Sequence, residues 1–338
     1  MTYAVRMSQI RIAVVGAGSW GTTVASLAAE NTPTTLWARR ADVAEEVAAG
    51  HRNTTYLGDV PLSPNLRAST DLAATVSDAD VVVMAVPSQG FRDVLSAAAP
   101  HIRPWVPVVS LSKGLEQGTL LRMSEVAREV VPGHPVAVLT GPNLAGEIAA
   151  GQPAASVVAI DDQVIAGALQ QIFSRPTFRV YTNTDVVGCE LAGVVKNVVA
   201  IASGIAAGLG FGDNTRATLI TRGLAEMVRL ATRMGGTLES LAGLAGMGDL
   251  IATCSSTKSR NMTVGMRLGR GERIEDITAS TTQVAEGVRS SRAVLDLANR
   301  HGVDMPITEQ VVAVCHDGVS AADALVALMT RQAQPENR

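Results

Sequence analysis

The stretch IRIAVVGAGSWG, residues 10–21, decides the fold. Its first half is a strand-like apolar run, and its second half has the spacing G-x-G-x-x-G at Gly16, Gly18 and Gly21. In this pattern the first glycine makes a tight turn, the second lets the backbone approach a pyrophosphate, and the third lets a helix pack on the strand. Backbone N–H groups at the helix start would face the phosphates. The stretch predicts a dinucleotide-binding fold, with a turn that serves only chain reversal as the alternative.

The residues that follow fit this prediction. A helix of small residues, TTVASLAA, comes directly after the glycines, and a second strand-like run, TTLWA at residues 34–38, ends in Arg39 and Arg40. At this place an NAD enzyme usually carries Asp or Glu for the ribose 2′-hydroxyl, whereas two guanidinium groups suit a 2′-phosphate. We therefore expect NADP(H) to be tolerated and preferred. The alternative is that the arginine pair is merely solvated at a strand end.

Size and composition narrow the class of protein. The chain has 338 residues, of which 47% are hydrophobic and 17% charged, so it is long enough for two globular domains. A formal charge of -3 without a basic cluster argues against nucleic acid or an anionic membrane as partner. The uncharged run at residues 197–212 is shorter than the roughly 20 apolar residues of a membrane span.

The cysteines favour a reducing compartment, and the amino terminus does not resemble a signal peptide. Cys189, Cys254 and Cys315 are widely separated and show neither a disulfide framework nor metal-ligand spacing, so we predict buried thiols and no metal. The apolar stretch near the amino terminus is too short for a signal peptide and runs straight into the glycines. We therefore expect a cytoplasmic protein.

The chain divides into two parts by its hydrophobic pattern. Up to residue 184, strand-like runs alternate with helix-like segments, which predicts a Rossmann-like doubly wound α/β sheet with its ligand beyond the carboxyl ends of the strands. The expected buried parallel strands include residues 81–86, 106–111, 136–139 and 155–159. From residue 185 to 330 we expect only helices, and therefore an all-α domain. The domain prediction is 9–184 and 185–330, with disordered tails at 1–8 and 331–338.

Lys196 is the only charged residue between Glu190 and Asp213, in an apolar helix of small residues. Burial of an ammonium is costly, so such a lysine is either paired or functional. Small side chains on the same helix face would leave room for a ligand beside the amine. A lysine that snorkels at a helix edge, or a structural ion pair, explains the pattern equally well.

Two later segments favour a functional lysine. In GMGDL, residues 246–250, the glycines would let the backbone turn tightly and present Asp249, whose carboxylate would hold an amine in place. In SSTKSRN, residues 255–261, hydroxyls and an arginine stand at an apparent helix start, a combination that suits phosphate. The simpler alternatives are a capping aspartate and a well-capped surface helix.

Two strand ends in the first half add candidates. SLSKGL, residues 110–115, places Lys113 just past a strand, on the expected cofactor side. GPNLA, residues 141–145, follows another strand and would form a rigid turn of close backbone approach. Each segment, taken alone, is also compatible with an ordinary loop.

The whole chain from about Ile10 to Met329 resembles bacterial NAD(P)-dependent sn-glycerol-3-phosphate dehydrogenases. The motifs that carry the resemblance occur in the family's order: GAGSWG, the arginine pair, SLSKGL, GPNLA, ELAGVVKNV, GLAGMGDL, SRN and QVAEG. One departure is Asn143, where the family usually has Thr or Ser. An amide can still donate to a substrate oxygen, so the role of Asn143 stays open.

The resemblance implies a role for each matching residue. Lys196 would be the general acid and base, with Asp249 beside it. The substrate would be held by Lys113, Gly141, Ser259, Arg260 and Asn261, together with Lys196 and Asp249, and Asn143 is a further candidate for a substrate contact. The dinucleotide, NADP(H) or NAD(H), would lie among Gly16, Gly18, Ser19, Trp20, Gly21, Arg39, Arg40, Lys113, Ala145, Arg260, Val284 and Glu286.

The implied reaction is the reversible reduction of dihydroxyacetone phosphate to sn-glycerol 3-phosphate at the entry to phospholipid synthesis. A two-domain reductase of a carboxylate substrate, such as ketopantoate or a β-hydroxyacid, is one alternative, and a non-catalytic dinucleotide sensor is another. Gly204 and Gly208 permit close helix packing, from which we predict a homodimer.

Overall fold

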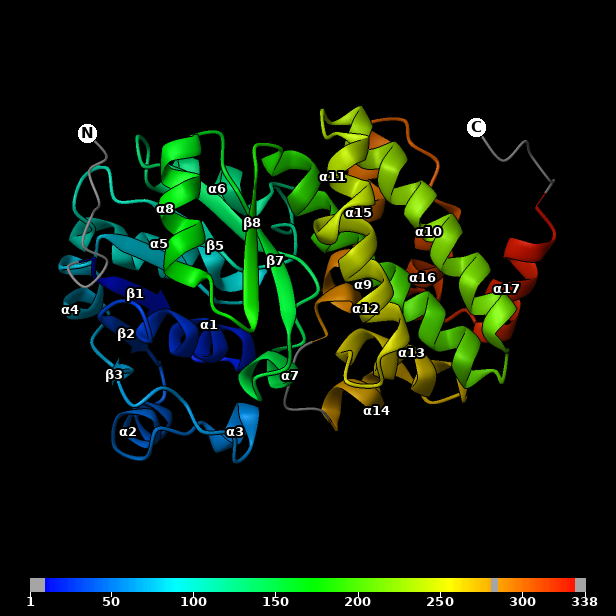
Figure 1. Ribbon diagram of the computed structural model, residues 1–338. Coiled ribbons are helices and arrows are strands. Elements are labelled where there is room, and N and C mark those ends of the chain that lie inside the picture. Colours follow the sequence, from blue (N-terminus) through cyan, green and yellow to red (C-terminus); the bar gives the residue numbers. More distant parts are fainter. Residues whose placement is uncertain (1–9, 281–284, 332–338) are drawn as a thin grey trace.

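The computed structural model describes residues 10–280 and 285–331, which form an α/β half and a helical half lying side by side (Figure 1). Within the described residues the strands make one eight-stranded sheet in the order β3-β2-β1-β4-β5-β6-β7-β8. The strands are β1 (Ile12–Val15), β2 (Thr34–Trp37), β3 (Arg67–Ser69), β4 (Val81–Met84), β5 (Val108–Ser110), β6 (Val136–Thr140), β7 (Ala154–Ala159) and β8 (Phe178–Asn183). The first six have the order 3-2-1-4-5-6 of dinucleotide-binding sheets. The predicted Rossmann-like fold is therefore confirmed.

The direction of β7 corrects one prediction. We expected residues 155–159 to be another parallel strand, but β7 runs antiparallel to β6, with Leu139 opposite Val158, and β8 then runs parallel to β7. The helix between β6 and β7 has only five residues, α7 (Ala145–Ala149). So short a helix cannot carry the chain back along the sheet to the amino edge, so β7 returns directly from the carboxyl edge.

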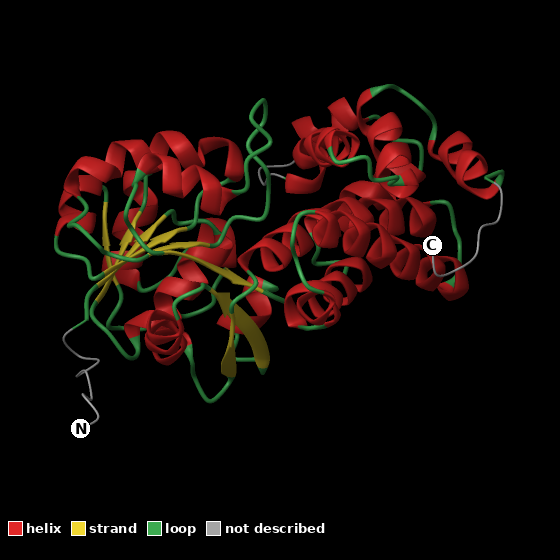
Figure 2. Cartoon of the chain, turned by 90° about the horizontal axis from the view of Figure 1, so that it is seen from above, coloured by secondary structure: helices red, strands yellow, loops and turns green. Residues whose placement is uncertain are grey.

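Helices cover both faces of the sheet, as Figure 2 shows from above. Val24 of α1 and Leu169 of α8 join the core on one face, while Leu95 of α5 and Val126 of α6 join the core on the other. The other helical bounds are α1 (Ser19–Ala29), α2 (Ala41–Gly50), α3 (Thr54–Leu57), α4 (Leu72–Ser77), η2 (Ser88–Gly90), α5 (Phe91–Ala98), η3 (Ala99–His101), α6 (Met123–Val130) and α8 (Gln163–Phe173). The helices cover the faces of the sheet, and the candidate site lies at the carboxyl ends of its strands.

The helical half is built around α9 (Val186–Gly208), which is buried along nearly its whole length. By length and composition α9 could cross a membrane, but 89% of its most apolar window is buried inside the molecule, as in the core helix of a helical bundle. Around it lie α10 (Asp213–Arg233), α11 (Leu238–Ala242), η4 (Leu244–Gly248), α12 (Asp249–Ser255), α13 (Arg260–Gly269), α14 (Ile274–Ala279), α15 (Glu286–Arg300), α16 (Pro306–His316) and α17 (Ala321–Met329).

Glycines let α9 and α13 pack backbone against backbone. A Cβ added to Gly204 would lie 2.2 Å from the Met262 carbonyl oxygen, and one added to Gly208 would lie 2.3 Å from that of Met266. Gly265 and Gly269 of α13 face these two glycines in turn. The predicted close helix packing is therefore present, but within one chain. Because α13 occupies this glycine face, it cannot serve a second copy, and the argument for a homodimer from Gly204 and Gly208 was wrong.

Two further predictions need correction. The GMGDL segment is not a tight turn: η4 is one turn of π-helix that leads directly into α12, so Asp249 is presented from a continuous helical segment. At the carboxyl end, Arg331 is ordered by an ion pair with Asp304, 2.7 Å long, so it does not belong to a tail. The remaining predicted tail residues, 1–8 and 332–338, lie outside the described residues.

Candidate active site

The three glycines after β1 have the geometry of a pyrophosphate cradle. Gly16 has φ +118°, and a Cβ there would lie 2.6 Å from the carbonyl oxygen of Ala85. A Cβ on Gly21 would lie 2.1 Å from the Gly16 carbonyl oxygen, so only glycine allows α1 to approach the strand. A Cβ added to Gly18, in contrast, would have no atom within 4 Å apart from its chain neighbours. The first and third glycines are thus needed for packing, and the second leaves open space that fits a dinucleotide.

The arginine pair lies beside this loop. Ala17 packs against Ala38 and Ala44, which flank the pair in sequence. Arg39 is exposed and has no ion-pair partner in the part of the chain that the structure describes. Arg40, also exposed, is paired with Asp42 in the first turn of α2. The two guanidinium groups therefore stand at the end of β2 as the sequence predicted, in different electrostatic states.

Three other cofactor candidates surround the start of α1. The Ser19 hydroxyl donates to the Tyr56 carbonyl, 3.0 Å away. The Trp20 ring meets Phe178 edge to face at 6.2 Å, and its buried Nε1 has no hydrogen-bond partner. The Ala145 carbonyl lies 3.3 Å from the Thr23 hydroxyl, so α7 begins against α1. Ser19 is thus tied to Tyr56, which packs against the cluster beside the arginine pair, whereas Trp20 and Thr23 contact β8 and α7.

A buried carboxylate joins two lysines where the halves meet. Asp249, 1% exposed, accepts a hydrogen bond from Lys196 Nζ at 2.6 Å on Oδ1 and from Lys113 Nζ at 2.7 Å on Oδ2. Lys196 also donates to the Thr253 hydroxyl at 2.7 Å, and Lys113 donates to the Gly141 carbonyl at 3.0 Å. Lys196 is therefore a buried, paired amine and not a snorkelling one. We call Lys113, Lys196 and Asp249 the lysine–aspartate centre.

The electrostatics of this centre suit proton transfer. The pKa of Lys196 is lowered to about 8, mainly by burial; the Asp249 carboxylate opposes this shift, and the neighbouring Lys113 ammonium adds to it. Two cations and one anion give the centre a net positive charge. An amine whose pKa lies near neutrality can both donate and accept a proton at physiological pH.

A chain of amides links three helices to the loop that carries Lys113. The Gly287 N–H donates to Asn261 Oδ1 at 3.0 Å, Asn261 Nδ2 donates to Asn197 Oδ1 at 2.9 Å, and Asn197 Nδ2 donates to the Lys113 carbonyl at 3.2 Å. We call this the amide relay. Asn261 is buried and uses both ends of its amide here, so its first role is to fix α13 against α9 and α15.

The expected phosphate clamp lies at the start of α13. The Ser259 hydroxyl caps this helix by accepting from the Met262 N–H at 3.3 Å, whereas Arg260 is exposed. Burial raises the pKa of Glu286 at the start of α15, and the positive charges of Arg260 and Lys113 oppose this shift. Glu286 thus lies within electrostatic reach of Arg260 on one side and of the lysines of the centre on the other. Val284 lies outside the described residues.

Gly141 and Asn143 differ in how they relate to this centre. Gly141 has φ +134°, and a Cβ there would lie 3.1 Å from Ser156 Cα, so the turn requires glycine. Its carbonyl faces Lys113 directly. Asn143 Nδ2 instead donates to the Ser156 hydroxyl at 3.3 Å, while its buried Oδ1 has no partner. The amide of Asn143 is therefore tied to the neighbouring strand.

Sequence reasoning missed Asn197 and Thr253. Thr253 stands four residues after Asp249 on α12, the spacing that puts two side chains on one helix face, so this signal was available. Asn197 follows Lys196 directly and faces away from Asp249, toward α13 and the Lys113 loop. Its partners are far away in sequence, and no local pattern points to them.

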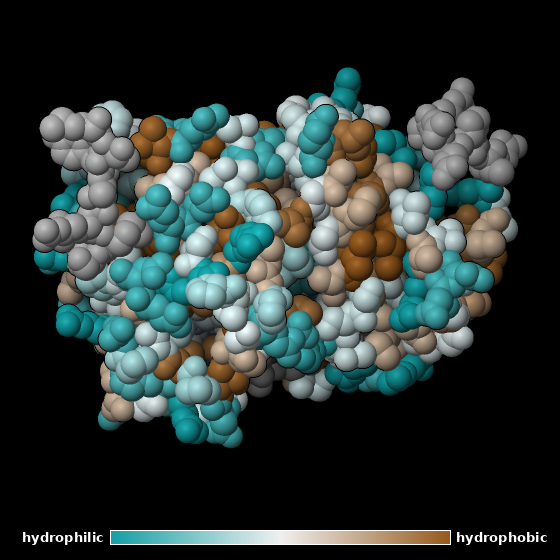
Figure 3. All heavy atoms as spheres, viewed as in Figure 1, coloured by the Kyte–Doolittle hydropathy of each residue, from teal (hydrophilic) through white to brown (hydrophobic). Residues whose placement is uncertain are grey.

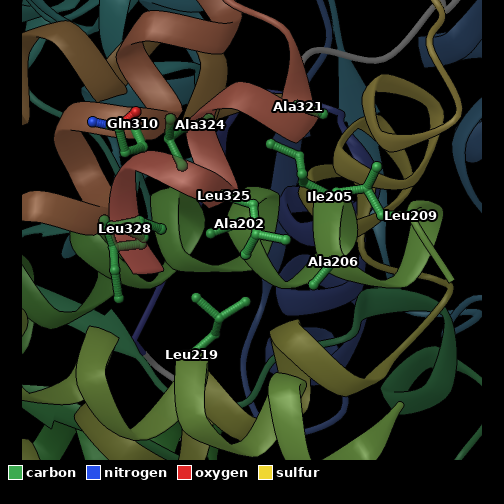
Figure 4. A pocket seen from close by; sticks show the side chains of 12 residues that line it. Ala202, Ile205, Ala206, Leu209, Leu219, Gln310, Ala321, Ala324, Leu325 and Leu328 are labelled. Carbon is green, nitrogen blue, oxygen red and sulfur yellow. The ribbon is translucent and has the colours of Figure 1, made fainter. Parts of the chain in front are cut away.

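Two features of the helical half play no part in the site. The three cysteines are buried and unpaired, and burial raises the pKa of each thiol to about 12. A cavity of about 30 Å³ lies between α9, α10, α16 and α17 (Figure 4), lined almost wholly by alanine, leucine, isoleucine and valine. So small an apolar cavity is a packing void and offers no groups for a charged substrate.

Comparisons with known proteins agree with this architecture. The family model described as NAD-dependent glycerol-3-phosphate dehydrogenase N-terminus matches residues 11–166, and the corresponding C-terminus model matches residues 185–326. A relative named glycerol-3-phosphate dehydrogenase (NAD(P)+) 2, from Sphingopyxis alaskensis, is 54% identical over 95% of this chain and 96% of its own length. Another named glycerol-3-phosphate dehydrogenase (NAD(P)+), from Thermobifida fusca, is 53% identical over 96% of this chain and 98% of its own.

A solved structure extends the agreement to three dimensions. The crystal structure of glycerol-3-phosphate dehydrogenase from Coxiella burnetii superposes with a TM-score of 0.91 at 38% identity, covering 96% of this chain and 99% of that one. Both halves of the chain and nearly its full length are therefore matched. This chain belongs to the family of NAD-dependent glycerol-3-phosphate dehydrogenases.

Proposed function

We propose that this protein catalyses the reversible NAD(P)H-dependent reduction of dihydroxyacetone phosphate to sn-glycerol 3-phosphate. The observation that carries the proposal is the lysine–aspartate centre, a buried amine held by a carboxylate at the junction of a dinucleotide-binding sheet and a helical half. Family membership supports the same reaction, since the relatives are named for it.

The chemistry divides between cofactor and protein. A bound NAD(P)H supplies the hydride. As negative charge grows on the carbonyl oxygen of the substrate, the Lys196 ammonium stabilises that charge and donates its proton. In the reverse direction the neutral Lys196 amine removes the proton from the hydroxyl. Asp249 keeps both lysines in place through its two oxygens.

The remaining side chains bind and orient. Arg260, exposed at the start of α13, and Lys113 are the cations we assign to the substrate phosphate, and we assign Gly141, Asn143, Ser259 and Asn261 to the remaining contacts with the substrate. We assign the dinucleotide to the glycine loop and to Ser19, Trp20, Arg39, Arg40, Lys113, Ala145, Arg260, Val284 and Glu286. The open space at Gly18 supports this assignment.

The two alternatives make different demands on the site. A ketopantoate or β-hydroxyacid reductase would bind a carboxylate instead of a phosphate, and family membership weighs against it. A dinucleotide sensor would need no buried ammonium and carboxylate. Inhibition by phosphate-containing substrate analogues, and its absence with carboxylate analogues, would separate the first alternative from our proposal.

We further infer a cytoplasmic enzyme that supplies glycerophospholipid synthesis, and we keep the homodimer as a prediction on a different surface. Figure 3 shows hydrophobic residues gathered on one face of the helical half. Leu238, Met247 and Ile251 of this half are exposed. Such a surface is compatible with a second copy. Sedimentation that detects only monomer would refute the dimer.

The deciding experiment is oxidation of NADPH or NADH on addition of dihydroxyacetone phosphate. We expect turnover with this substrate and none with ketopantoate. Lys196→Ala should lower kcat by orders of magnitude, roughly 10²-fold to 10⁴-fold, with dinucleotide affinity nearly unchanged. Near-native turnover of that variant would remove the acid–base assignment, and turnover only with a carboxylate substrate would remove the proposed function.

A further inference from the structure

We propose that Asp42 sets the balance between NADP(H) and NAD(H): its carboxylate occupies the guanidinium of Arg40 and thereby weakens binding of a 2′-phosphate. The inference rests on the proposed function, because it requires that the glycine loop bind a dinucleotide. It concerns one charged pair at the end of β2 and adds a residue that counteracts the arginines.

The pair is bidentate and local. Arg40 Nε donates to Asp42 Oδ1 at 3.0 Å, and Arg40 Nη2 donates to Asp42 Oδ2. Arg40 is the residue before α2, and Asp42 lies in the first turn of that helix. Two parallel hydrogen bonds use one edge of the guanidinium in full, and this is also the geometry by which arginine binds a phosphate. A phosphate that uses this edge must displace the carboxylate, and one that binds at the remaining Nη1 side meets a guanidinium whose charge is already compensated.

The position of the pair makes it relevant to the adenine ribose. Ala17 of the glycine loop packs against the cluster of Ala38, Val43 and Ala44, so the turn between β2 and α2 lies beside the cradle. In dinucleotide-binding folds the group that contacts the ribose 2′ position comes from the end of the second strand. The Arg40 and Asp42 side chains are 51% and 63% exposed, so a bound ribose can reach both.

The charges treat the two cofactors differently. Arg40 holds the pKa of Asp42 below its usual value, so the carboxylate is fully ionised at neutral pH. An approaching 2′-phosphate meets this anion and must compete with it for Arg40. A 2′-hydroxyl meets a carboxylate that can accept its hydrogen bond, as in NAD enzymes, and an arginine whose charge is already compensated. Asp42 therefore opposes NADP(H) without opposing NAD(H).

The neighbouring Arg39 explains why NADP(H) still binds. Arg39 is exposed and lacks an ion-pair partner among the described residues, so its charge is available to the 2′-phosphate. One free and one compensated guanidinium give a site that accepts both cofactors. If Asp42 instead oriented Arg40 toward the phosphate, removal of the carboxylate would weaken NADP⁺ binding, the opposite of what we expect.

The test is calorimetric titration of the full-length protein with NADP⁺ and with NAD⁺, at about pH 8, where the 2′-phosphate is fully charged. For Asp42→Asn we expect the Kd of NADP⁺ to fall roughly twofold to fivefold, the range of an exposed charge pair. The Kd of NAD⁺ should stay unchanged or rise. An unchanged ratio of the two constants, or weaker NADP⁺ binding, would overturn the proposal.

Two variants keep the result interpretable. Asp78→Asn removes an aspartate from a similar exposed pair, with Arg11, which lies before β1 at the amino edge of the sheet, and it should change neither Kd. In Arg40→Gln/Asp42→Asn the gain in NADP⁺ affinity should largely disappear, because the freed guanidinium is gone. If the unmodified protein binds neither dinucleotide, the proposed function fails with the inference. If it binds both and only the ratio fails to move, the inference alone is wrong.

Discussion

Lys113 and Lys196, which belong to different halves of the molecule, donate to opposite oxygens of one carboxylate, that of Asp249. Both ammonium groups are largely buried, with side-chain exposures of 13% and 8%. Removal of the carboxylate would leave two unpaired cations side by side in a region with little water. Buried charges without a partner are strongly destabilising. Asp249 is therefore the residue on which the geometry of the centre depends.

We expect Asp249→Asn to lower kcat of dihydroxyacetone phosphate reduction by about 10²-fold or more, the scale of losing a positioned acid. The reason is that Lys196 loses both its anchor and the charge that keeps it protonated. The pKa seen in the rate profile should therefore move to lower pH. Thr253→Ser, which keeps the hydroxyl bonded to Lys196, is the matched control. A variant with the native pH profile would show that Asp249 does not act through Lys196.

The rate should depend on pH in opposite ways for the two directions. Reduction needs the Lys196 ammonium, and its pKa is lowered to about 8, so kcat of reduction should fall as pH rises through this value. Oxidation of glycerol 3-phosphate needs the neutral amine, so its kcat should rise over the same interval. Steady-state rates at saturating cofactor would measure both. Profiles that rise or fall together would contradict the assignment.

Glycine-to-alanine substitutions should change the stability of the protein in opposite directions at the contact between α9 and α13 and at an open helix position. A Cβ on Gly265 would lie 2.1 Å from the Ile201 carbonyl oxygen, so Gly265→Ala should destabilise the protein by about 2–5 kcal/mol. Gly167 lies in α8 with nothing within 4 Å of an added Cβ, so Gly167→Ala should stabilise it by roughly 0.5–1 kcal/mol. Urea unfolding measures both. Equal effects would mean that α9 and α13 are not in backbone contact.

A buried acid predicts pH-dependent stability away from the site. Glu226 of α10, 1% exposed, accepts from the N–H groups of Ile307 and Thr308 at 2.5 and 3.1 Å and thereby caps α16. Burial raises its pKa to about 7, whereas an unfolded chain titrates at about 4.3. The folded state therefore binds the proton more tightly, and this contribution is lost as pH rises through about 7.

Glu226→Gln removes that titration. Between about pH 5 and 8 the free energy of unfolding of the native protein should fall relative to the variant, by on the order of 2 kcal/mol. Paired urea titrations at the two ends of this interval would measure the difference. A difference that stays constant with pH would show that Glu226 is ionised throughout.

The sequence predicted the fold where the signal is local. The glycine loop, the buried strands β1 and β4 and the helices α9 and α10 follow from spacing and apolar runs of neighbouring residues. β3 has three partly exposed residues and no apolar run, so its pairing with β2 depends on the rest of the sheet. β8 alternates buried Phe178 and Val180 with exposed neighbours, a period-two pattern that was present and was overlooked.

The sequence indicated which residues belong to the site better than it indicated which of them contact each other. Lys196 stood out because it is a single charge in an apolar helix, but its bond to Asp249 spans 53 residues of sequence and that of Lys113 spans 136. No periodicity encodes such contacts. Gly204 and Gly208 did indicate close packing, and the matching Gly265 and Gly269 could have identified α13 as the partner.

The glycine contact between α9 and α13 has a consequence for selectivity. Lys196 stands on one of these helices and Arg260 on the other, so their separation is fixed by a joint in which no side chain can flex. The two helices therefore hold the backbones of these two cationic residues at a fixed distance from each other. We therefore expect the enzyme to prefer dihydroxyacetone phosphate to keto-phosphates in which the carbonyl and the phosphate are further apart.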